Sequence, residues 1–225
     1  MKDRIKIDSA ILSLAIIMTG VLYKFPHLYS SNRFLDNVWD FIGLMIVLKG
    51  IFIRMLARGH KKVHSKEGSI LVITGIYTLS RNPMYLGSFL MGAGFVFIVW
   101  PWWTLPLFAA LFYLRFHRQV ILEEEHLQKL FKEDYITYSQ KVSRVFPTFT
   151  QIKAMKVKQI VNLKEVFSTQ EKWGLIGWPI LAVFLETLQE KIVFGYTNFE
   201  LTVSIFLEAM IAYVILEFIK YQLWN

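Results

Sequence analysis

Long apolar runs recur along this chain of 225 residues, and they constrain its fold more than any other feature. Each run has roughly the ~17–25 residues that an α-helix needs to cross the hydrocarbon core of a bilayer. Hydrophobic residues make up 55% of the chain, which exceeds the apolar share of a typical soluble domain. Most of the runs also lack the polar face of a helix at the surface of a soluble protein. We therefore predict an all-α fold, that of a polytopic helical membrane protein.

About six membrane spans are predicted from these runs. The first run follows a basic N-terminus, as in a signal peptide, but no small-residue cleavage site comes after it, so we expect an uncleaved span. The last two runs contain or border Glu186, Glu208 and Glu217, and charges are costly inside a bilayer. The predicted spans are Ile7–Tyr23, Val38–Leu56, Pro83–Val99, Trp103–Leu122, Trp173–Leu188 and Leu201–Leu223.

The basic residues gather before the first span and in the second and fourth connections. The remaining connections carry only Lys24, Arg33 and Lys191. The positive-inside rule then predicts that both termini and the two basic connections are cytoplasmic, which an even number of spans also requires. The net charge of +8 would lie near anionic lipid headgroups. No nucleic acid partner is predicted, because the basic residues lie in the connections between spans and do not form one aromatic-lined stripe.

The absence of cysteine from the sequence excludes disulfides, thiolate metal sites and a cysteine nucleophile, and no metal site is predicted. Charged residues inside the predicted spans could line the path of a transporter; they are Asp40, Lys49, Arg54, Glu186 and Glu208. However, the chain lacks two similar halves with Gly- or Pro-broken spans. Lys49 and Asp40 could equally pair with partners on other helices, and a non-catalytic membrane scaffold would also explain the spans.

The segment "GIYTLSRNPMYLG" (residues 75–87) directly precedes and enters the third span. Asn82 is a favoured N-cap and Pro83 a favoured first helical residue, so the pair predicts where the helix begins. The unpaired N–H groups of a helix N-terminus favour an anion. Arg81 beside them could grip a carboxylate or phosphate, although an arginine here could also be a simple interfacial anchor.

A second polar segment, residues 116–147, follows the fourth span, and its apolar spacing predicts that the helix continues into the cytoplasm. Its run of three glutamates, residues 123–125, is either a solvated acidic turn or a binding site for a cationic group. A short turn makes the third and fourth spans a hairpin, which places Arg81 and Glu123 at the same end. An anion site beside a cation site suits a zwitterion, such as the amino acid end of a cofactor.

The two segments in this order resemble the signature of the isoprenylcysteine carboxyl methyltransferase and phospholipid methyltransferase superfamily, whose members are integral membrane enzymes that use S-adenosylmethionine. The resemblance covers residues 75–147. Asn82 stands where the superfamily usually has histidine, and an amide cannot act as a base. Lys132 stands where it usually has glycine, and is expected to replace a turn glycine. The matching residues are Gly75, Tyr77, Arg81, Pro83, Tyr85, Gly87, Glu123, Glu124, Leu127, Phe131, Tyr135, Arg144 and Pro147.

The resemblance implies roles for particular residues. Glu123 would hold the ammonium or ribose of the cofactor, and Glu124 would support Glu123 or the neighbouring arginine. Arg81 would orient the cofactor carboxylate or the first helical turn, and Arg118 is a candidate for substrate contact. Two histidines of the basic connection, His60 and His64, could close over the site. The remaining cofactor contacts would come from Ser69, Ile70, Leu71, Val72, Tyr77, Asn82, Pro83, Met84 and Tyr85.

The predicted organisation is a single membrane domain (1–225), with a cofactor-binding methyltransferase core at 57–147 and an extension at 148–225 that carries the last two spans. The predicted function is methyl transfer from S-adenosylmethionine to a lipophilic, membrane-embedded acceptor, such as an isoprenylcysteine carboxylate. A sulfonium methyl group is already activated, so the enzyme mainly supplies positioning, and a carboxylate needs no base. The acceptor would enter from the bilayer and the cofactor from the cytoplasm. A phospholipid amine N-methyltransferase and a reductase related to sterol reductases are alternatives.

Overall fold

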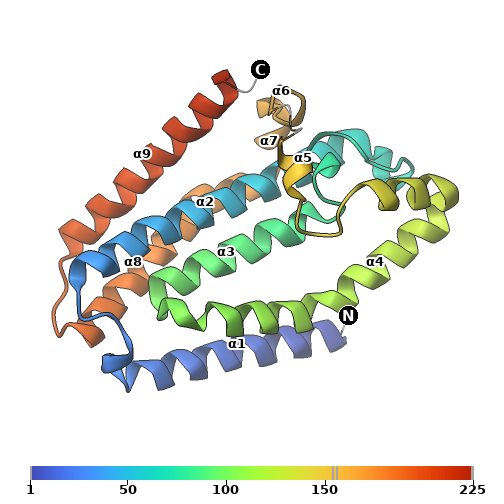
Figure 1. Ribbon diagram of the computed structural model, residues 1–225. Helices are drawn as coiled ribbons and strands as arrows, with labels where there is room; N and C mark the ends of the chain where they lie inside the picture. The colour runs from blue at the N-terminus through green and yellow to red at the C-terminus, as the bar shows by residue number, and fades with distance from the viewer. Residues whose placement is uncertain (1, 154, 156, 224–225) are drawn as a thin grey trace.

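The long apolar runs fold into long helices in the computed structural model, which describes residues 2–153, 155 and 157–223 (Figure 1). Helices and their connections account for all of this described part, without strands, and the all-α prediction is confirmed. The long helices are α1 (Lys2–Tyr23), α2 (Arg33–His64), α3 (Pro83–Val99), α4 (Leu105–Lys141), α8 (Gly174–Val193) and α9 (Phe199–Leu223). The short ones are α5 (Phe149–Lys153), α6 (Val157–Ile160), α7 (Leu163–Val166) and the 3-10 turns η1 (Pro26–Leu28), η2 (Lys66–Gly68), η3 (Gly75–Thr78), η4 (Trp102–Thr104) and η5 (Gln170–Trp173).

Each predicted span overlaps one long helix, and the bounds of α3 agree with the prediction at both ends. Helices α2 and α4 run further than the apolar runs, α2 to His64 and α4 to Lys141. Asn82 occupies the N-cap position of α3, as predicted, but its side chain makes no capping bond, because its amide nitrogen donates to the Glu124 carboxylate instead. Helix α2 is capped by Asn32, whose side chain accepts from the amides of residues 34 and 35.

Among the described residues, one helix is both long and apolar enough to cross a membrane, Phe199–Ile219 within α9. The stretches Ser13–Tyr23 and Pro83–Val99 are shorter apolar helices. Charged residues inside α2 and α8 lower the apolar character of those helices. These charged side chains are paired with opposite charges or clustered with one another. Lys49 pairs with Glu217 at 2.7 Å, as expected.

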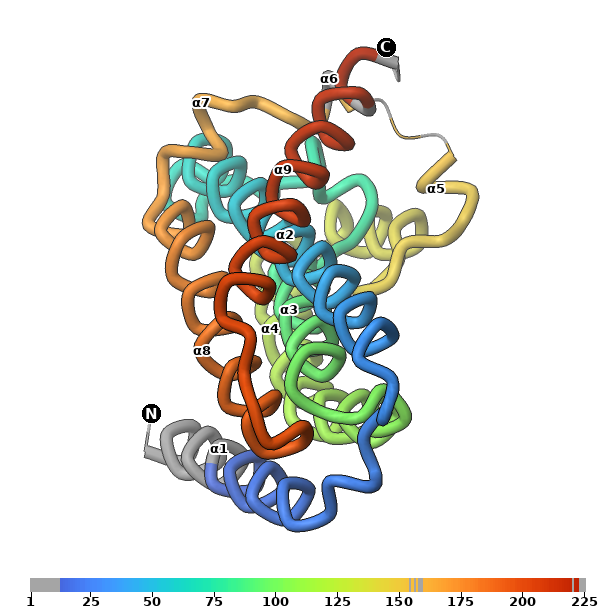
Figure 2. Tube along the Cα trace, turned by 90° about the vertical axis from the view of Figure 1, so that its left-hand side faces the viewer, coloured from blue at the N-terminus to red at the C-terminus, as the bar shows by residue number. Residues whose placement is uncertain are grey.

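Helix α2 lies at the centre of the bundle, with α3, α9 and α8 packed around it (Figures 1 and 2). Reciprocal glycines let the α2 and α3 backbones approach closely. A Cβ atom added at Gly50 would lie 2.6 Å from the carbonyl oxygen of Gly87, and one at Gly94 would lie 2.5 Å from that of Gly43. Small residues at such contacts are characteristic of helix packing in membranes. Because the two pairs are one heptad apart on each helix, they fix the position of α3, and thus of its N-terminus, against α2.

Asp40 has carboxylates as neighbours in this bundle. Its carboxylate lies close to those of Asp36 on the same helix and Glu186 on α8. The Asp40 and Glu186 side chains are almost wholly buried. The basic residue at this end of α2, Arg33, pairs with a different carboxylate, that of Glu190, at 2.6 Å.

Lys132 interrupts α4 with φ +44° and ψ −120°, a backbone conformation that side chains with a Cβ rarely adopt. The expectation that this residue replaces a turn glycine is confirmed by its positive φ.

We predict that Lys132→Gly raises the free energy of unfolding by about 1 kcal/mol, because relief of backbone strain outweighs the entropy that glycine adds to the unfolded chain. Lys129→Gly is the matched control: Lys129 is exposed in a regular part of α4, and glycine there should cost about 1 kcal/mol. Denaturant titrations in one mild detergent would compare the two variants with the wild type, and an equal loss in both would contradict the prediction.

Candidate functional site

A buried carboxylate, that of Glu124, lies at the centre of the candidate site. Asn82 Nδ2 donates to its Oε1 at 2.9 Å, and Arg144 Nε donates to its Oε2 at 3.0 Å. The Arg81 guanidinium lies 3.6 Å from Oε1. A buried carboxylate can keep its charge only when it is paired and hydrogen-bonded. Glu124 therefore joins the middle of α4 to the start of α3 and to the segment after α4.

Backbone hydrogen bonds reinforce this junction. The amides of Arg81 and Asn82 donate to the carbonyl oxygens of Ser143 and Arg144, at 2.9 and 3.1 Å. Asn82 Nδ2 makes a second bond, to the Arg144 carbonyl oxygen, at 3.0 Å. The amide at the position where the superfamily usually has histidine thus bridges two chain segments.

Glu123, the neighbouring acid, faces a different environment and is exposed. Its Oε1 accepts from the Tyr85 hydroxyl at 2.8 Å and from Gln119 Nε2 at 2.6 Å. The third and fourth predicted spans do form a hairpin, and this contact brings the α3 N-terminus to the glutamate run, as predicted. Of the two consecutive glutamates, one therefore ties the fold together and the other is accessible to a ligand.

Two cavities adjoin near these residues. The first, of about 520 Å³, is lined by mainly apolar side chains of α1, α3, α4 and α8, together with Ser88 and Arg115. The second, of about 480 Å³, lies between α3, α4 and the segment that follows α4; Tyr85 and Arg144 line it. Phe112 and Phe116 line both cavities and therefore form a common wall.

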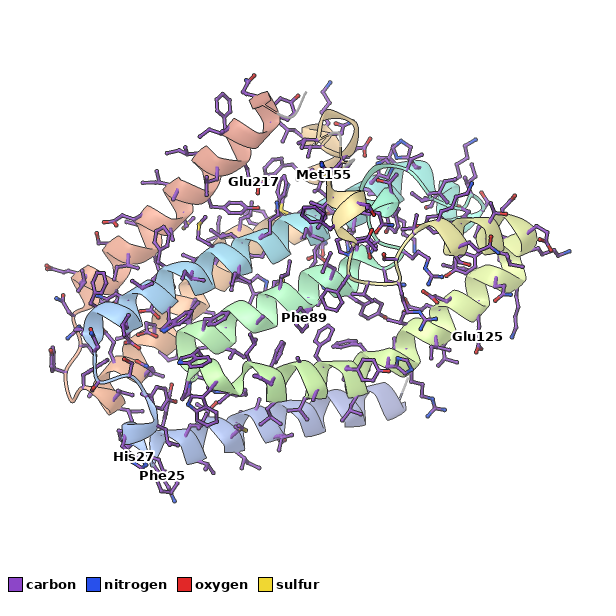
Figure 3. All side chains as sticks on the ribbon, in the orientation of Figure 1. Phe25, His27, Phe89, Glu125, Met155 and Glu217 are labelled. Carbon is purple, nitrogen blue, oxygen red and sulfur yellow. The ribbon has the colours of Figure 1, made fainter. Side chains whose placement is uncertain are left out.

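Aromatic contacts complete the wall of the second cavity. Phe89, which also lines this cavity, points from α3 toward α4 (Figure 3). Its ring packs edge-on against the rings of Phe112 and Phe146, with centroids 5.2 Å apart in each case. The second cavity is thus bounded by rings from α3, from α4 and from the segment after α4.

Two buried polar atoms at the Glu124 cluster make no hydrogen bond of acceptable geometry: Arg81 Nε and the Tyr135 hydroxyl oxygen. Burial and the Glu124 carboxylate raise the pKa of the Tyr135 hydroxyl, so this group stays protonated and able to donate. Two buried donors that make no hydrogen bond of acceptable geometry could serve a carboxylate group, and the exposed Glu123 carboxylate could serve an ammonium or a ribose hydroxyl. The donor set therefore fits the amino acid end of S-adenosylmethionine.

The predicted site residues do not all gather here. The structure brings together Arg81, Asn82, Tyr85, Glu123 and Glu124.

Other residues of the predicted cofactor set either point into the fold or lie in a loop. The Tyr77 hydroxyl donates to the Ala57 carbonyl oxygen of α2 at 3.3 Å. Pro83 is buried, and Met84 packs against the hydrophobic core. The residues Ser69, Ile70, Leu71 and Val72 form the loop between η2 and η3, where Ser69 and Ile70 are exposed.

Arg118, the predicted substrate contact, is exposed and lines neither of the two cavities described above. Its neighbours do so: Arg115 lines the first cavity and His117 the second. His60 and His64 lie at the end of α2, in contact with α7.

Arg144 and Tyr135 belong to the motif but were not among the predicted site residues. The position of an arginine shortly before Pro147 was the available signal for Arg144. Contacts made by α1 and α8 with the first cavity have no local sequence signal, because they depend on how distant helices pack.

The all-helical chain thus holds a buried glutamate–arginine cluster and a mainly apolar cavity, and it is similar to known proteins. Residues 39–134 match the family model described as phospholipid methyltransferase. The chain is 30% identical over 134 residues to the protein-S-isoprenylcysteine O-methyltransferase of Saccharomyces cerevisiae, a match that covers 56% of each chain. It is 25% identical over 151 residues to a probable protein-S-isoprenylcysteine O-methyltransferase of Oryza sativa subsp. indica, covering 62% of this chain and 79% of the relative.

The match thus spans about half the length of the yeast relative, and no solved structure matches the chain significantly. These findings confirm the resemblance to the isoprenylcysteine carboxyl methyltransferase and phospholipid methyltransferase superfamily.

We predict that Glu124→Gln and Glu123→Gln, chemically identical changes at adjacent positions, have different effects on stability. Glu124→Gln removes the charge that Arg81 and Arg144 face, and should lower the free energy of unfolding by about 2–3 kcal/mol. This loss is smaller than that expected for a fully buried ion pair, because Arg144 is partly solvated. Glu123→Gln at an exposed position should change it by less than about 0.5 kcal/mol. Denaturant titration in detergent measures both, and equal losses would show that Glu124 does not tie the segments together.

Proposed function

We propose that this protein is an integral membrane enzyme that transfers the methyl group of S-adenosylmethionine to the carboxylate of a lipophilic acceptor of the isoprenylcysteine type. The observation that carries the proposal is the shared wall of Phe112 and Phe116. It separates an apolar cavity, suited to a lipid chain, from a second cavity lined by Tyr85, whose hydroxyl donates to the exposed Glu123. The names of the yeast and rice relatives support the same reaction class.

The cofactor would be held by the residues around the Glu124 cluster. Glu123, with Tyr85, would bind the ammonium or ribose, and Arg81 Nε with the Tyr135 hydroxyl would bind the carboxylate. The loop of Ser69, Ile70, Leu71 and Val72 would lie along the adenosine, as the resemblance implies. When bound, S-adenosylmethionine supplies a methyl group on a positively charged sulfur, already activated for displacement.

The side chains of this chain would then position the acceptor and exclude water. A carboxylate arrives deprotonated, so an asparagine at position 82 is compatible with the reaction. Arg115 lines the apolar cavity, and its guanidinium carbon lies 5.0 Å from the centre of the Phe116 ring. We infer that Arg115 orients the acceptor carboxylate at the shared wall, a role expected for Arg118 from the sequence.

A phospholipid amine is the second candidate acceptor, which the description of the matching family favours. An amine must lose a proton before it attacks. His117 lines the second cavity and is the residue there that could accept this proton.

The proposed topology has six membrane-spanning helices, with both termini, the extension of α4 and the active site on the cytoplasmic side. The lipophilic acceptor would enter from the bilayer through the apolar cavity, and the cofactor would enter from the cytoplasm. Basic residues of the cytoplasmic connections would contact anionic lipid.

Methyl transfer can be tested with purified protein, radiolabelled S-adenosylmethionine and two acceptors, a prenylated cysteine with a free carboxylate and phosphatidylethanolamine. Leu111→Trp should fill part of the apolar cavity that Leu111 lines and raise the KM for the prenylated cysteine about tenfold or more, a cost of the order that a mismatched apolar pocket imposes. The Kd for S-adenosylmethionine should stay unchanged. Leu114→Trp, at an exposed position of the same helix, is the matched control.

Glu123→Ala should abolish cofactor binding while the protein stays folded. Folded wild-type protein that binds no S-adenosylmethionine would refute the proposed function. Methylation of phosphatidylethanolamine alone would establish the second candidate.

The topology can be tested with single cysteines, because the chain contains none. Ser31→Cys lies in the α1–α2 connection and Glu125→Cys in the extension of α4, and both positions are exposed. A membrane-impermeant maleimide should label Ser31→Cys on intact cells and Glu125→Cys only after permeabilisation. Labelling of both from one side would contradict the proposed arrangement.

A further inference from the structure

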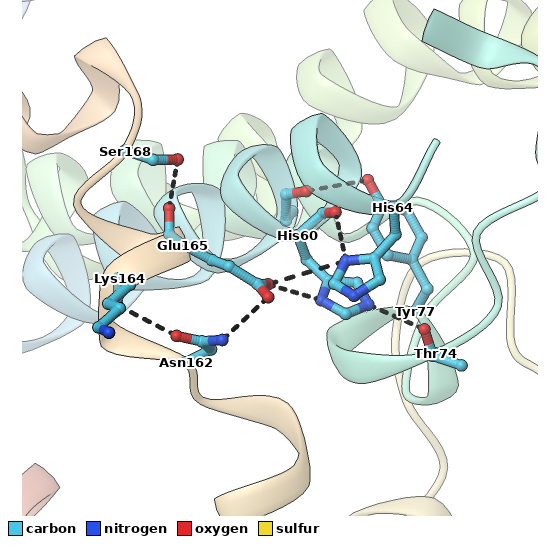
Figure 4. A network of polar contacts seen from close by, with 9 residues as sticks. His60, His64, Thr74, Tyr77, Asn162, Lys164, Glu165 and Ser168 are labelled. Carbon is cyan, nitrogen blue, oxygen red and sulfur yellow. Dashed lines mark hydrogen bonds and ion pairs between the residues drawn. The ribbon is translucent and has the colours of Figure 1, made fainter. Parts of the chain in front are cut away.

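Three potential metal ligands meet where the end of α2 contacts α7 (Figure 4). His60 and His64 are one helical turn apart on α2, and their rings stack with centroids 3.9 Å apart. Glu165 reaches them from α7: its Oε2 lies 2.9 Å from His60 Nδ1 and 3.9 Å from His64 Nδ1. One ring nitrogen of each histidine and one carboxylate oxygen of Glu165 therefore lie within 4.8 Å of one another.

These separations suit a small transition-metal ion. Ligand atoms at the usual ~2.0–2.1 Å from a tetrahedral zinc ion lie about 3.4 Å from one another. The two observed separations lie on either side of this value, so shifts of about half an ångström, together with a rotation of the His64 ring, would give metal geometry. Two histidines four residues apart on one helix face are also the spacing by which helices hold zinc.

The ligand atoms are already oriented by further hydrogen bonds. His60 Nε2 contacts the Thr74 hydroxyl at 2.9 Å, which leaves Nδ1 for a metal. Glu165 Oε1 accepts from Asn162 Nδ2 at 3.0 Å, which leaves Oε2. Such outer contacts characteristically fix the tautomer and orientation of metal ligands. His64 is the most exposed of the three, and a rotation of its ring would release its Nδ1 from the His60 carbonyl oxygen at 3.0 Å.

Two glycines make room for this arrangement. A Cβ atom at Gly59 would collide with the Glu165 carbonyl oxygen. One at Gly75, which has φ +61°, would lie 2.8 Å from His60 Nε2. Close backbone approach at Gly59 therefore brings α7 to the histidines, and Gly75 lets the segment before Tyr77 pass over the His60 ring.

We propose that His60, His64 and Glu165 form a binding site for a divalent transition-metal ion of the zinc type, with water as a further ligand. Two imidazoles and one carboxylate are a donor set that such ions favour. The ion would join α7 to α2 across 105 residues of sequence. Through Thr74 it would also fix the start of η3, next to the loop of residues 69–72 that is proposed to hold the adenosine. The ligands lie outside the Glu124 cluster, so metal binding can be measured separately from the proposed methyl transfer.

The proposal can be tested with protein purified without a polyhistidine tag, stripped by a chelator, and titrated with Co²⁺ and then Zn²⁺. Wild-type protein should bind one equivalent of Co²⁺, and the bound Co²⁺ should show the visible absorption of a site with nitrogen ligands. Zn²⁺ should displace the Co²⁺ and abolish this absorption. His64→Asn and Glu165→Gln should each weaken binding by about tenfold or more. Metal should also raise the thermal midpoint of the wild type and not of these variants.

His27→Asn is the matched control, because His27 is exposed in η1 and should retain wild-type binding. His64 is partly exposed, so His64→Asn should fold even if a variant of the buried His60 does not. The proposal is overturned if the wild type binds no stoichiometric metal. It is equally overturned if His64→Asn and Glu165→Gln bind as the wild type does, since the cluster would then be a hydrogen-bonded network alone.

Discussion

The Glu124 carboxylate is the interaction on which the candidate site depends. It is buried, so its charge must be matched by donors, and the donors come from the two segments that flank the site. Asn82 and Arg81 precede α3, and Arg144 follows α4. Satisfying one carboxylate thus closes the end of the α3–α4 hairpin and holds the segment after α4 across it. Glu123 is left exposed by the same arrangement, because consecutive residues on a helix point in different directions.

The junction has a definite place because α3 itself is fixed. Gly43 and Gly50 of α2 meet Gly94 and Gly87 of α3 without intervening side chains, so a shift of either helix along the other would create backbone collisions. Such packing needs no hydrophobic driving force between helices, which a lipid environment does not supply. The start of α3 is therefore set by backbone shape, and this also fixes the position of Arg81, which lies just before the helix.

The sequence predicted those features that depend on neighbouring residues. The limits of α3 followed from Pro83 and the apolar run, and the positive φ of Lys132 followed from a position where glycine is usual. Features that depend on distant segments were not accessible. Asn82 has the chemistry of a helix cap, but the carboxylate that engages its amide lies 42 residues away. The Tyr77 hydroxyl donates to α2, a contact that no local pattern indicates.

The extension beyond the motif also contributes to the site, although the motif ends at Pro147. Trp178, Leu181 and Leu185 of α8 line the apolar cavity. Glu171, which precedes α8, pairs with Arg54 at 2.9 Å, and Arg54 in turn donates to Ser88 at the wall of that cavity at 2.6 Å. A lipid chain in the apolar cavity would therefore contact both the motif-bearing hairpin and the extension. Under the proposed function, the hairpin would supply the groups that bind the cofactor, whereas α1 and α8 would shape the apolar cavity. Differences in acceptor chain length should therefore depend on residues of α1 and α8 more than on the motif.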